Sequence, residues 1–231
     1  MLQRKRKRER ARAPARFLLI EFKSRAGARA WARSRLWGIF SVCVLMGLTG
    51  CSVFSPLPDQ QQQFVLEKLP KITPHRPKDI SLMISRPASS PLYDTTQIAY
   101  SQKKWEVNYF AKSCWGARPS EMIQDLLVQM FQASHAYTMV SKVPMTGQDN
   151  AILNSEIIRF REDLTGAYPV FEFVFRVDLV QGTDDKTHHV HQFSSIRPLS
   201  SLSPYAMAVA ANEAVADVLH QVEIFCTPKK H

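Results

Sequence analysis

An apolar run at residues 36–48, LWGIFSVCVLMGL, constrains this 231-residue chain more than any other feature. Its length of about a dozen residues is typical of the hydrophobic part of an export signal, and is too short to span a bilayer core of about 30 Å as a helix. Arg29, Arg33 and Arg35 precede the run and provide the positive flank that such a signal needs. A buried helix of a globular core would instead show a polar face. The run therefore predicts an exported protein from which residues 1–50, a signal with a basic N-terminal extension, are removed.

The residues at the end of the run, Leu48-Thr49-Gly50-Cys51, resemble a lipobox. In that motif small residues before a cysteine allow a lipoprotein peptidase to cut once the thiol carries diacylglycerol. We therefore expect cleavage before Cys51 and lipidation of that residue. Ser52 follows the cysteine, and by resemblance to enterobacterial lipoproteins it favours transfer to the outer membrane, with the domain on the periplasmic face.

The net charge of +10 resides in the segment that processing removes. Residues 1–50 contain 13 Lys and Arg against 2 Asp and Glu, whereas residues 51–231 contain 17 against 18. Nucleic-acid binding requires a basic face on the folded domain. The mature chain is nearly neutral, so its composition argues against nucleic acid as a partner.

The mature chain divides into a tether, residues 51–63, and a single domain, residues 64–231. The tether contains two prolines and four glutamines without apolar periodicity. In the domain, apolar side chains alternate over residues 80–84, 105–109 and 171–179, which predicts half-buried strands. We expect the strand at 171–179 to pair with residues 151–161 across a turn at Thr165-Gly166, with a bulge near Ile157. Further strands are expected at residues 97–101, 137–143 and 189–196, the last after a turn at residues 182–185.

Two segments show helical periodicity. The first opens with Pro119 and Ser120 and places its apolar residues on one stripe. The second runs from about Pro204 to Phe225, with Ser203 as its expected N-cap and many alanines that suggest close packing. The order of elements predicts an α+β fold, a mainly antiparallel sheet with two amphipathic helices packed on one face.

Motifs that carry chemistry are absent from the sequence. There is no Gly-rich phosphate loop, HExxH, CxxC pair or GxSxG. We therefore expect no catalytic residues and no cofactor, although an unrecognised hydrolase stays an alternative because triads are defined by geometry. His188, His189 and His191 suggest a metal site, but a polar hairpin end is favoured, since no ligands of suitable spacing accompany them.

Two cysteines and three aromatic residues complete the candidate sites. Cys114 and Cys226 would be oxidised to a disulfide in the periplasm if their Cα atoms approach closely enough; the alternative is two free buried thiols. Tyr93, Trp105 and Tyr205 stand at ends of expected strands or helices, where the core pattern does not demand them. They are candidates for a partner surface, with plain packing as the alternative.

The segment from Gln97 to Met122, QIAYSQKKWEVNYFAKSCWGARPSEM, resembles the ABC-type transport auxiliary lipoproteins, the PqiC-like family. The resemblance continues in the residues after the tether, in the aromatic strand around Phe171, and in Ala211-Asn212-Glu213-Ala214 of the last helix. One departure is Ala133-Ser134-His135-Ala136-Tyr137, where a typical member has Ser-Gly before an aromatic residue.

The resemblance implies an outer-membrane lipoprotein that is a partner of a periplasmic MCE-type protein and its ABC transporter in lipid transport. It implies a non-catalytic docking subunit, with a homo-oligomeric ring as one arrangement. The alternative from another class is a lipoprotein that regulates a cell-wall enzyme. A tether of about a dozen residues, spanning at most roughly 40 Å, keeps the domain near its membrane and favours the first interpretation.

Overall fold

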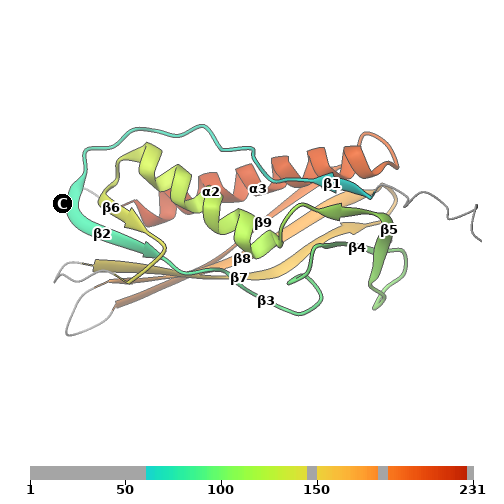
Figure 1. The fold of residues 1–231 in the computed structure, drawn as a ribbon, viewed down its shortest axis with the longest axis horizontal. Coiled ribbons are helices and arrows are strands. Elements are labelled where there is room, and N and C mark those ends of the chain that lie inside the picture. Colours follow the sequence, from blue (N-terminus) through green and yellow to red (C-terminus); the bar gives the residue numbers. More distant parts are fainter. Residues whose placement is uncertain (1–60, 145–149, 182–186, 228–231) are drawn as a thin grey trace, which may run out of the picture. The chain divides into compact units, whose positions relative to one another are not determined.

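One long strand, β7 (Asn150–Asp163), organises the sheet of this protein (Figure 1). The structure is a computed structural model that describes residues 61–144, 150–181 and 187–227. On one side, β7 pairs antiparallel with β8 (Val170–Gln181), which pairs antiparallel with β9 (Thr187–Pro198). The predicted hairpin across Thr165-Gly166 is confirmed. The turn predicted at residues 182–185 lies outside the described residues.

The other edge of β7 is shared by three short strands in succession. They are β2 (Lys78–Ile84), β3 (Ala88–Ser89) and β4 (Gln97–Ser101), each parallel to β7. The sheet extends through β6 (Tyr137–Ser141) beside β2, β5 (Asn108–Trp115) beside β4, and β1 (Gln62–Phe64) beside β5. The parallel pairs are short and the antiparallel β7–β8–β9 ladder is long, so the predicted α+β class with a mainly antiparallel sheet is confirmed.

The predicted bulge interrupts β7 between Ile157 and Arg159. Ile157 pairs with Phe175, whereas Arg159 pairs with Val174, so one extra residue stands on β7. The extra residue changes which positions face the helices: Ile157 does so before the bulge and Phe160 after it, and both are buried. By the same alternation Glu162, two residues beyond Phe160, faces the helical side.

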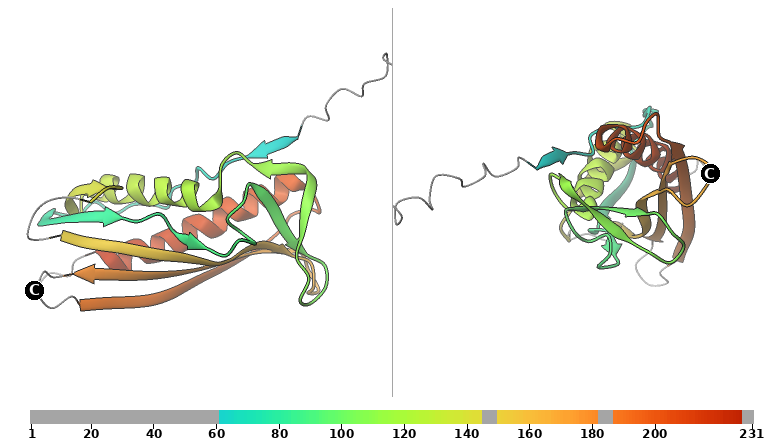
Figure 2. Two further views of the ribbon diagram at one scale, coloured as in Figure 1. Left: turned by 60° about the horizontal axis from the view of Figure 1, so that its bottom comes forward. Right: turned by 90° about the vertical axis from the view of Figure 1, so that its right-hand side faces the viewer.

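Two helices cover one face of the sheet (Figure 2). They are α2 (Pro119–Ser134) and α3 (Pro204–Cys226). The side chain of Ser203 accepts a hydrogen bond from the backbone N–H of Ala206, as predicted for its N-cap. At 1.5 Å per residue, α3 is about 35 Å long, and it runs from beside β1 to the far ends of β8 and β9 (Figure 1). Among the described residues, no helix has the length and apolarity needed to cross a bilayer.

An extended segment between β1 and β2, residues 65–77, crosses the helices on their outer side (Figure 1). We call this segment the strap. Leu66 anchors it in the core, and the side chain of Asn212 holds it: Oδ1 accepts from the N–H groups of Glu67 and Lys68, at 2.9 and 3.1 Å, and Nδ2 donates to the carbonyl of Val65 at 2.9 Å. Three turns further along α3, the buried carboxylate of Glu223 accepts from the N–H of Thr73 at 3.4 Å.

The core between sheet and helices is aromatic at its centre. Phe160 makes edge contacts with Phe171 and Phe173, with ring centroids 4.9 and 5.4 Å apart, and Trp115 packs against it at 5.5 Å. Opposite these rings, α3 presents small side chains, which let the helix lie close to the sheet. Its buried alanines are Ala206, Ala208, Ala210, Ala211, Ala214 and Ala216.

Candidate functional site

The face of the sheet turned away from the helices carries paired charges. Arg159 and Arg161 both pair with Glu172, the latter at 3.6 Å. Further along the sheet, Arg176 pairs with Glu156, and His188 approaches Asp178 at 2.9 Å. Cross-strand pairs of this kind neutralise one another and contribute at most about 1 kcal/mol each when exposed. Each charge just named on this face therefore has an oppositely charged partner or, for His188, a carboxylate beside it, and the face is exposed around Arg176 and His188 and half-buried around Glu172 and Arg161.

A groove of about 600 Å³ opens at the end of the sheet where α3 finishes. We call it the distal groove. Its walls come from the last residues of β8, the first half of β9 and the last turns of α3: Leu179, Gln181, His189, His191, Phe193, Gln221, Ile224, Phe225, Cys226 and Thr227. Half of these lining residues are apolar and the others are Gln, His and Thr, so the groove is suited to an apolar side chain of a partner with polar groups around it.

The aromatic wall of the distal groove is rigidly built. The His191 ring lies 4.6 Å from that of Phe193 and 5.6 Å from that of Phe225, and the two phenylalanines are 5.7 Å apart. The hydroxyl of the buried Tyr137 donates a hydrogen bond to the carbonyl of Cys226, which lines the groove. This bond replaces the hydrogen bond to water that the phenol loses when it is buried. Burial raises the pKa of Tyr137 well above its usual range, so its phenol stays neutral. At the rim, Ile224 is 63% exposed.

The opposite end of the domain holds two of the three predicted surface residues. We call it the tethered end; it consists of the β4–β5 turn (residues 102–107), the β7–β8 turn (164–169), the loop before α3 (199–203) and the first turn of α3. Trp105 and Tyr205 lie here and are exposed. Trp105 does not start a strand as predicted, because β5 begins at Asn108 and Trp105 lies in the turn with a φ of 65°.

The third predicted surface residue is corrected by the structure. Tyr93 is 7% exposed and belongs to the hydrophobic core. It lies in the turn that joins β3 to β4, where its N–H donates to the carbonyl of Ser90 at 2.9 Å, and its side chain is buried near Arg159, Arg161 and Glu172. A position near a strand end therefore did not distinguish Tyr93 from the two exposed residues.

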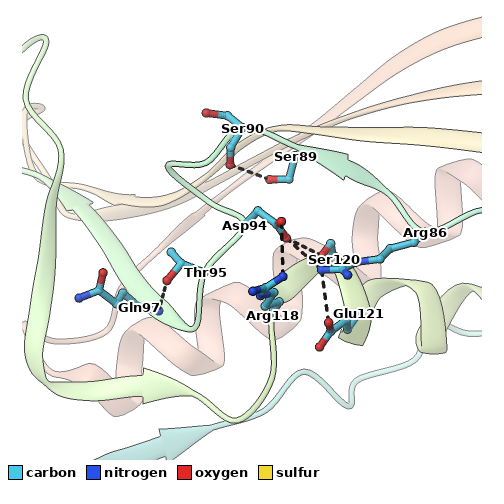
Figure 3. A network of polar contacts seen from close by, with 9 residues as sticks. All are labelled: Arg86, Ser89, Ser90, Asp94, Thr95, Gln97, Arg118, Ser120 and Glu121. Carbon is cyan, nitrogen blue, oxygen red and sulfur yellow. Dashed lines mark hydrogen bonds and ion pairs between the residues drawn. The ribbon is translucent and has the colours of Figure 1, made fainter.

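A polar network surrounds the start of α2 (Figure 3). The guanidinium of Arg86 donates to the Asp94 carboxylate at 3.1 Å and to the Ser120 hydroxyl at 2.8 Å, and Ser120 donates to Asp94 at 3.0 Å. Glu121 and Arg118 extend it, at 3.3 Å from Arg86 and 3.8 Å from Asp94. The network places a carboxylate at a helix N-terminus whose N-cap, Arg118, provides no side-chain cap. Each of these five side chains is engaged, so the network ties the segment after β2, the β3–β4 turn and the start of α2 together.

Glu162 is a buried carboxyl group without a polar partner among the described residues. It is 3% exposed and lines a mostly apolar pocket of about 400 Å³ at the tethered end. In the strand registers its neighbours on the same face are Tyr100 and Phe171. Burial raises its pKa to about 7. One lone carboxyl group offers no nucleophile and base pair, so we assign it no catalytic role.

The two cysteines of the domain are free and buried in the structure. Cys114 lies on β5 opposite Gln63 of β1, whereas Cys226 ends α3. From Asn212, which holds the strap just after β1, α3 continues for about 20 Å to Cys226, whereas a disulfide requires Cα atoms within about 7 Å. Of the two alternatives, the structure contains the free thiols. Burial raises the pKa of Cys226 to about 12, which makes its thiol a poor nucleophile.

The three histidines separate onto the two faces of β9. His188 points to the charged outer face, whereas His189 and His191 line the distal groove. In the described part of the chain, no group of three or more His, Cys, Asp or Glu residues is placed to hold a metal ion. The charged and apolar surfaces, rather than any reactive cluster, are therefore the candidates for function.

The structure is thus an α+β domain with a paired-charge sheet face and grooves at its two ends. Comparison with protein families identifies the domain: residues 64–223 match the model described as the ABC-type transport auxiliary lipoprotein component. The chain belongs to this family, and the resemblance to PqiC-like proteins is confirmed. No curated protein sequence matches the chain.

Solved structures agree in fold. Protein XCC0632 from Xanthomonas campestris, of family DUF330, is similar with a TM-score of 0.60 and 20% identity, over 70% of this chain and 92% of that one. A second crystal structure, of an uncharacterized protein, has a TM-score of 0.58 and 12% identity, over 71% and 96%. At these identities the likeness concerns the fold alone.

Several residues of these surfaces escaped sequence reasoning. Phe225 was expected only as the end of the last helix, and neither Ile224 nor Glu162 was singled out. Tyr168 and Leu202 offered a usable signal, since large apolar residues in turns have no core to explain them.

Proposed function

We propose that this chain is the outer-membrane lipoprotein subunit of an MCE-type intermembrane lipid transport system. In this role it docks the periplasmic MCE protein and does not act on a substrate itself. Its family, described as an auxiliary component of ABC-type transport, supports partners that belong to a transporter. Lipidation of Cys51, predicted from the sequence, would hold the domain at the membrane.

The observation that carries the proposal is the distal groove. It combines apolar and polar lining residues with the exposed Ile224, and its aromatic wall of His191, Phe193 and Phe225 is preformed. Preformed apolar pockets that accept a partner's side chain are the usual centres of protein interfaces, because they need little reorganisation on binding.

The position of the groove fits a partner that approaches from the periplasm. The tether joins the domain at β1, beside the start of α3, whereas the groove lies at the end of α3, about 35 Å further along the helix. An anchor at Cys51 therefore leaves the groove free to point away from the outer membrane. An MCE protein that extends from the inner membrane would meet this end first.

The proposal is tested by site-specific photocrosslinking in cells that carry the full transport system. A crosslinking residue at position 224 should capture the MCE protein, and Ile224→Asp should abolish its co-isolation with the lipoprotein. The matched control is Ile196→Asp, because Ile196 is 61% exposed, nearly as much as Ile224, but lies on the outer face of β9. Co-isolation that survives Ile224→Asp, or is lost equally in Ile196→Asp, would exclude the groove as the docking site.

A deletion strain tests the wider role. Loss of the protein should weaken the lipid barrier of the outer membrane and increase sensitivity to detergent. Capture of a cell-wall enzyme instead of an MCE protein, together with unchanged detergent resistance, would favour the regulator of a cell-wall enzyme. The homo-oligomer stays a prediction, which mass measurement of the lipidated protein in detergent would test.

A further inference from the structure

Large exposed apolar side chains gather at the tethered end. In the described part of the chain the four most exposed are Trp105 at 100%, Tyr168 at 76%, Leu202 at 75% and Tyr205 at 71%. They come from three separate turns and the start of α3. Apolar residues scattered singly over a surface are ordinary, but the most exposed ones gathered at one end mark an interaction site.

The turns that carry these residues are fixed to one another. Gln102, Leu164 and Leu202, one from each turn, line the same pocket. The N–H of Leu164 donates to the carbonyl of Ser101 at 2.9 Å, and the N–H of Leu199 donates to that of Pro169 at 3.0 Å. The exposed residues therefore belong to one structured surface rather than to independent loops.

Trp105 is presented to solvent by an unusual backbone. Its φ of 65° lies in the left-handed region, which an aromatic residue rarely adopts and which costs of order 1 kcal/mol or more. A buried ring would compensate this cost within the fold, but the ring of Trp105 is fully exposed. Lys103 and Lys104, both exposed, precede it in the same turn.

The attachment of the domain brings this end close to the membrane. Tyr205 shares a groove with Gln63 and Phe64 of β1, where the described chain begins. Gln62 follows Cys51 by 11 residues, a length that spans at most about 40 Å when fully extended. A lipid on Cys51 is therefore joined to the domain at the tethered end rather than at the distal groove.

We propose that the tethered end rests in the headgroup region of the membrane, with Trp105, Tyr168, Leu202 and Tyr205 inserted between lipids. Tryptophan and tyrosine favour this interface because their rings are apolar and their N–H or O–H stays hydrated. Lys103 and Lys104 fit lipid phosphates at the same depth. The inference rests on the lipid anchor of the proposed function. Because the anchor already holds the chain at the membrane, the contact of these side chains with lipid is effectively intramolecular, so even a weak affinity is enough for it to form.

The test uses fluorescence, because Trp105 and Trp115 are the two tryptophans of residues 51–231. The mature chain is coupled through the Cys51 thiol to a maleimide lipid in vesicles of phosphatidylethanolamine and phosphatidylglycerol. Coupling makes the result independent of processing in the cell, and the buried Cys114 and Cys226 are shielded from the reagent. The emission of Trp105 should shift to shorter wavelength and be quenched by lipids brominated near the headgroup.

Three variants sharpen the test. Trp105→Phe should leave only the unquenched emission of Trp115, which is 2% exposed. The triple variant Tyr168→Ser, Leu202→Ser, Tyr205→Ser should lose most of the quenching of Trp105, whereas Ile224→Ser, at the distal groove, should retain it.

A second experiment distinguishes the attraction of the lysines to anionic lipid from the insertion of the aromatic and apolar side chains. Lys103→Gln with Lys104→Gln should reduce quenching more in vesicles with anionic lipid than in neutral phosphatidylcholine. The inference is overturned if Trp105 in the anchored chain stays as accessible to iodide as in the free chain, or if the triple variant and Ile224→Ser behave alike. Failure to co-isolate an MCE protein would refute the proposed function without affecting these outcomes.

Discussion

Replacing Glu162 by glutamine should stabilise the domain at alkaline pH and leave its stability at acidic pH nearly unchanged. In the folded protein burial raises the pKa of Glu162 to about 7, whereas the carboxyl group of a glutamate in an unfolded chain has a pKa near 4.5. Glutamine has nearly the same shape and carries no charge. The difference between the two proteins therefore isolates the cost of ionising this carboxyl group in its pocket.

The sign follows from proton binding. Between pH 4.5 and 7 the folded state retains a proton on Glu162 that the unfolded state has lost, so the free energy of unfolding falls as the pH rises. The free energy of unfolding is therefore unaffected by this carboxyl group below about pH 4.5, and above about pH 7 it is lowered by the full cost of ionising the buried group. A difference of about 2.5 pKa units corresponds to roughly 3 kcal/mol, and water that reaches the pocket reduces the expected effect to about 2 kcal/mol.

Urea unfolding at a series of pH values measures this effect. Glu162→Gln should exceed the wild-type domain by about 2 kcal/mol at pH 8.5 and by much less at pH 4.5. The matched control, Glu67→Gln, replaces an exposed carboxylate on the strap by the same amide. A difference between Glu162→Gln and wild type that stays constant over this pH range would refute the reasoning.

Three further changes test the packing, the strap and the anchor. Phe173→Ala removes a ring that contacts Phe160 and should cost about 3–5 kcal/mol in urea unfolding, mostly through the cavity it leaves; a loss below about 1 kcal/mol would mean that this part of the core is loosely packed. Asn212→Ala removes three hydrogen bonds to the strap, and because water can reach these groups the expected loss is about 1–2 kcal/mol, with faster amide exchange in residues 65–68. Unchanged exchange there would show that Leu66 alone holds the strap. Cys51→Ala should abolish palmitate labelling of the protein in cells, and labelling that persists would place the acceptor elsewhere.

Elements with a strong local pattern could be predicted from the sequence. The alternation around Phe173, the cap at Ser203 and the break near Ile157 each depend on a few neighbouring residues, and each was found where expected. The short parallel strands β2, β3 and β4 were harder, because their order along β7 depends on contacts between residues 60 to 70 positions apart. Trp105 was assigned to a strand because its alternation with Val107 and Tyr109 continues into the turn.

The candidate sites were predicted less completely than the fold. Composition could exclude a basic nucleic-acid surface, and motif search found no catalytic pattern, because both depend only on residue type and spacing. The sequence could not show that Tyr93 is buried while Tyr205 is exposed, because burial depends on which other segments of the chain fold over a residue. Nor could it place Ile224 and Phe225 at a groove whose other wall comes from β8 and β9.

The sequence by itself predicts an export signal with a cysteine at its end, and it determined the alternation of the strands and the amphipathic helices, because these properties belong to contiguous residues. Only the tertiary structure decided which side chains meet. The one-residue bulge in β7 turns Glu162 toward the helices, and Cys114 on β5 and Cys226 at the end of α3 are buried as free thiols. Three turns distant in sequence converge to place Trp105, Tyr168 and Leu202 at one end, because sheet pairing and helix packing bring chain segments together regardless of their order.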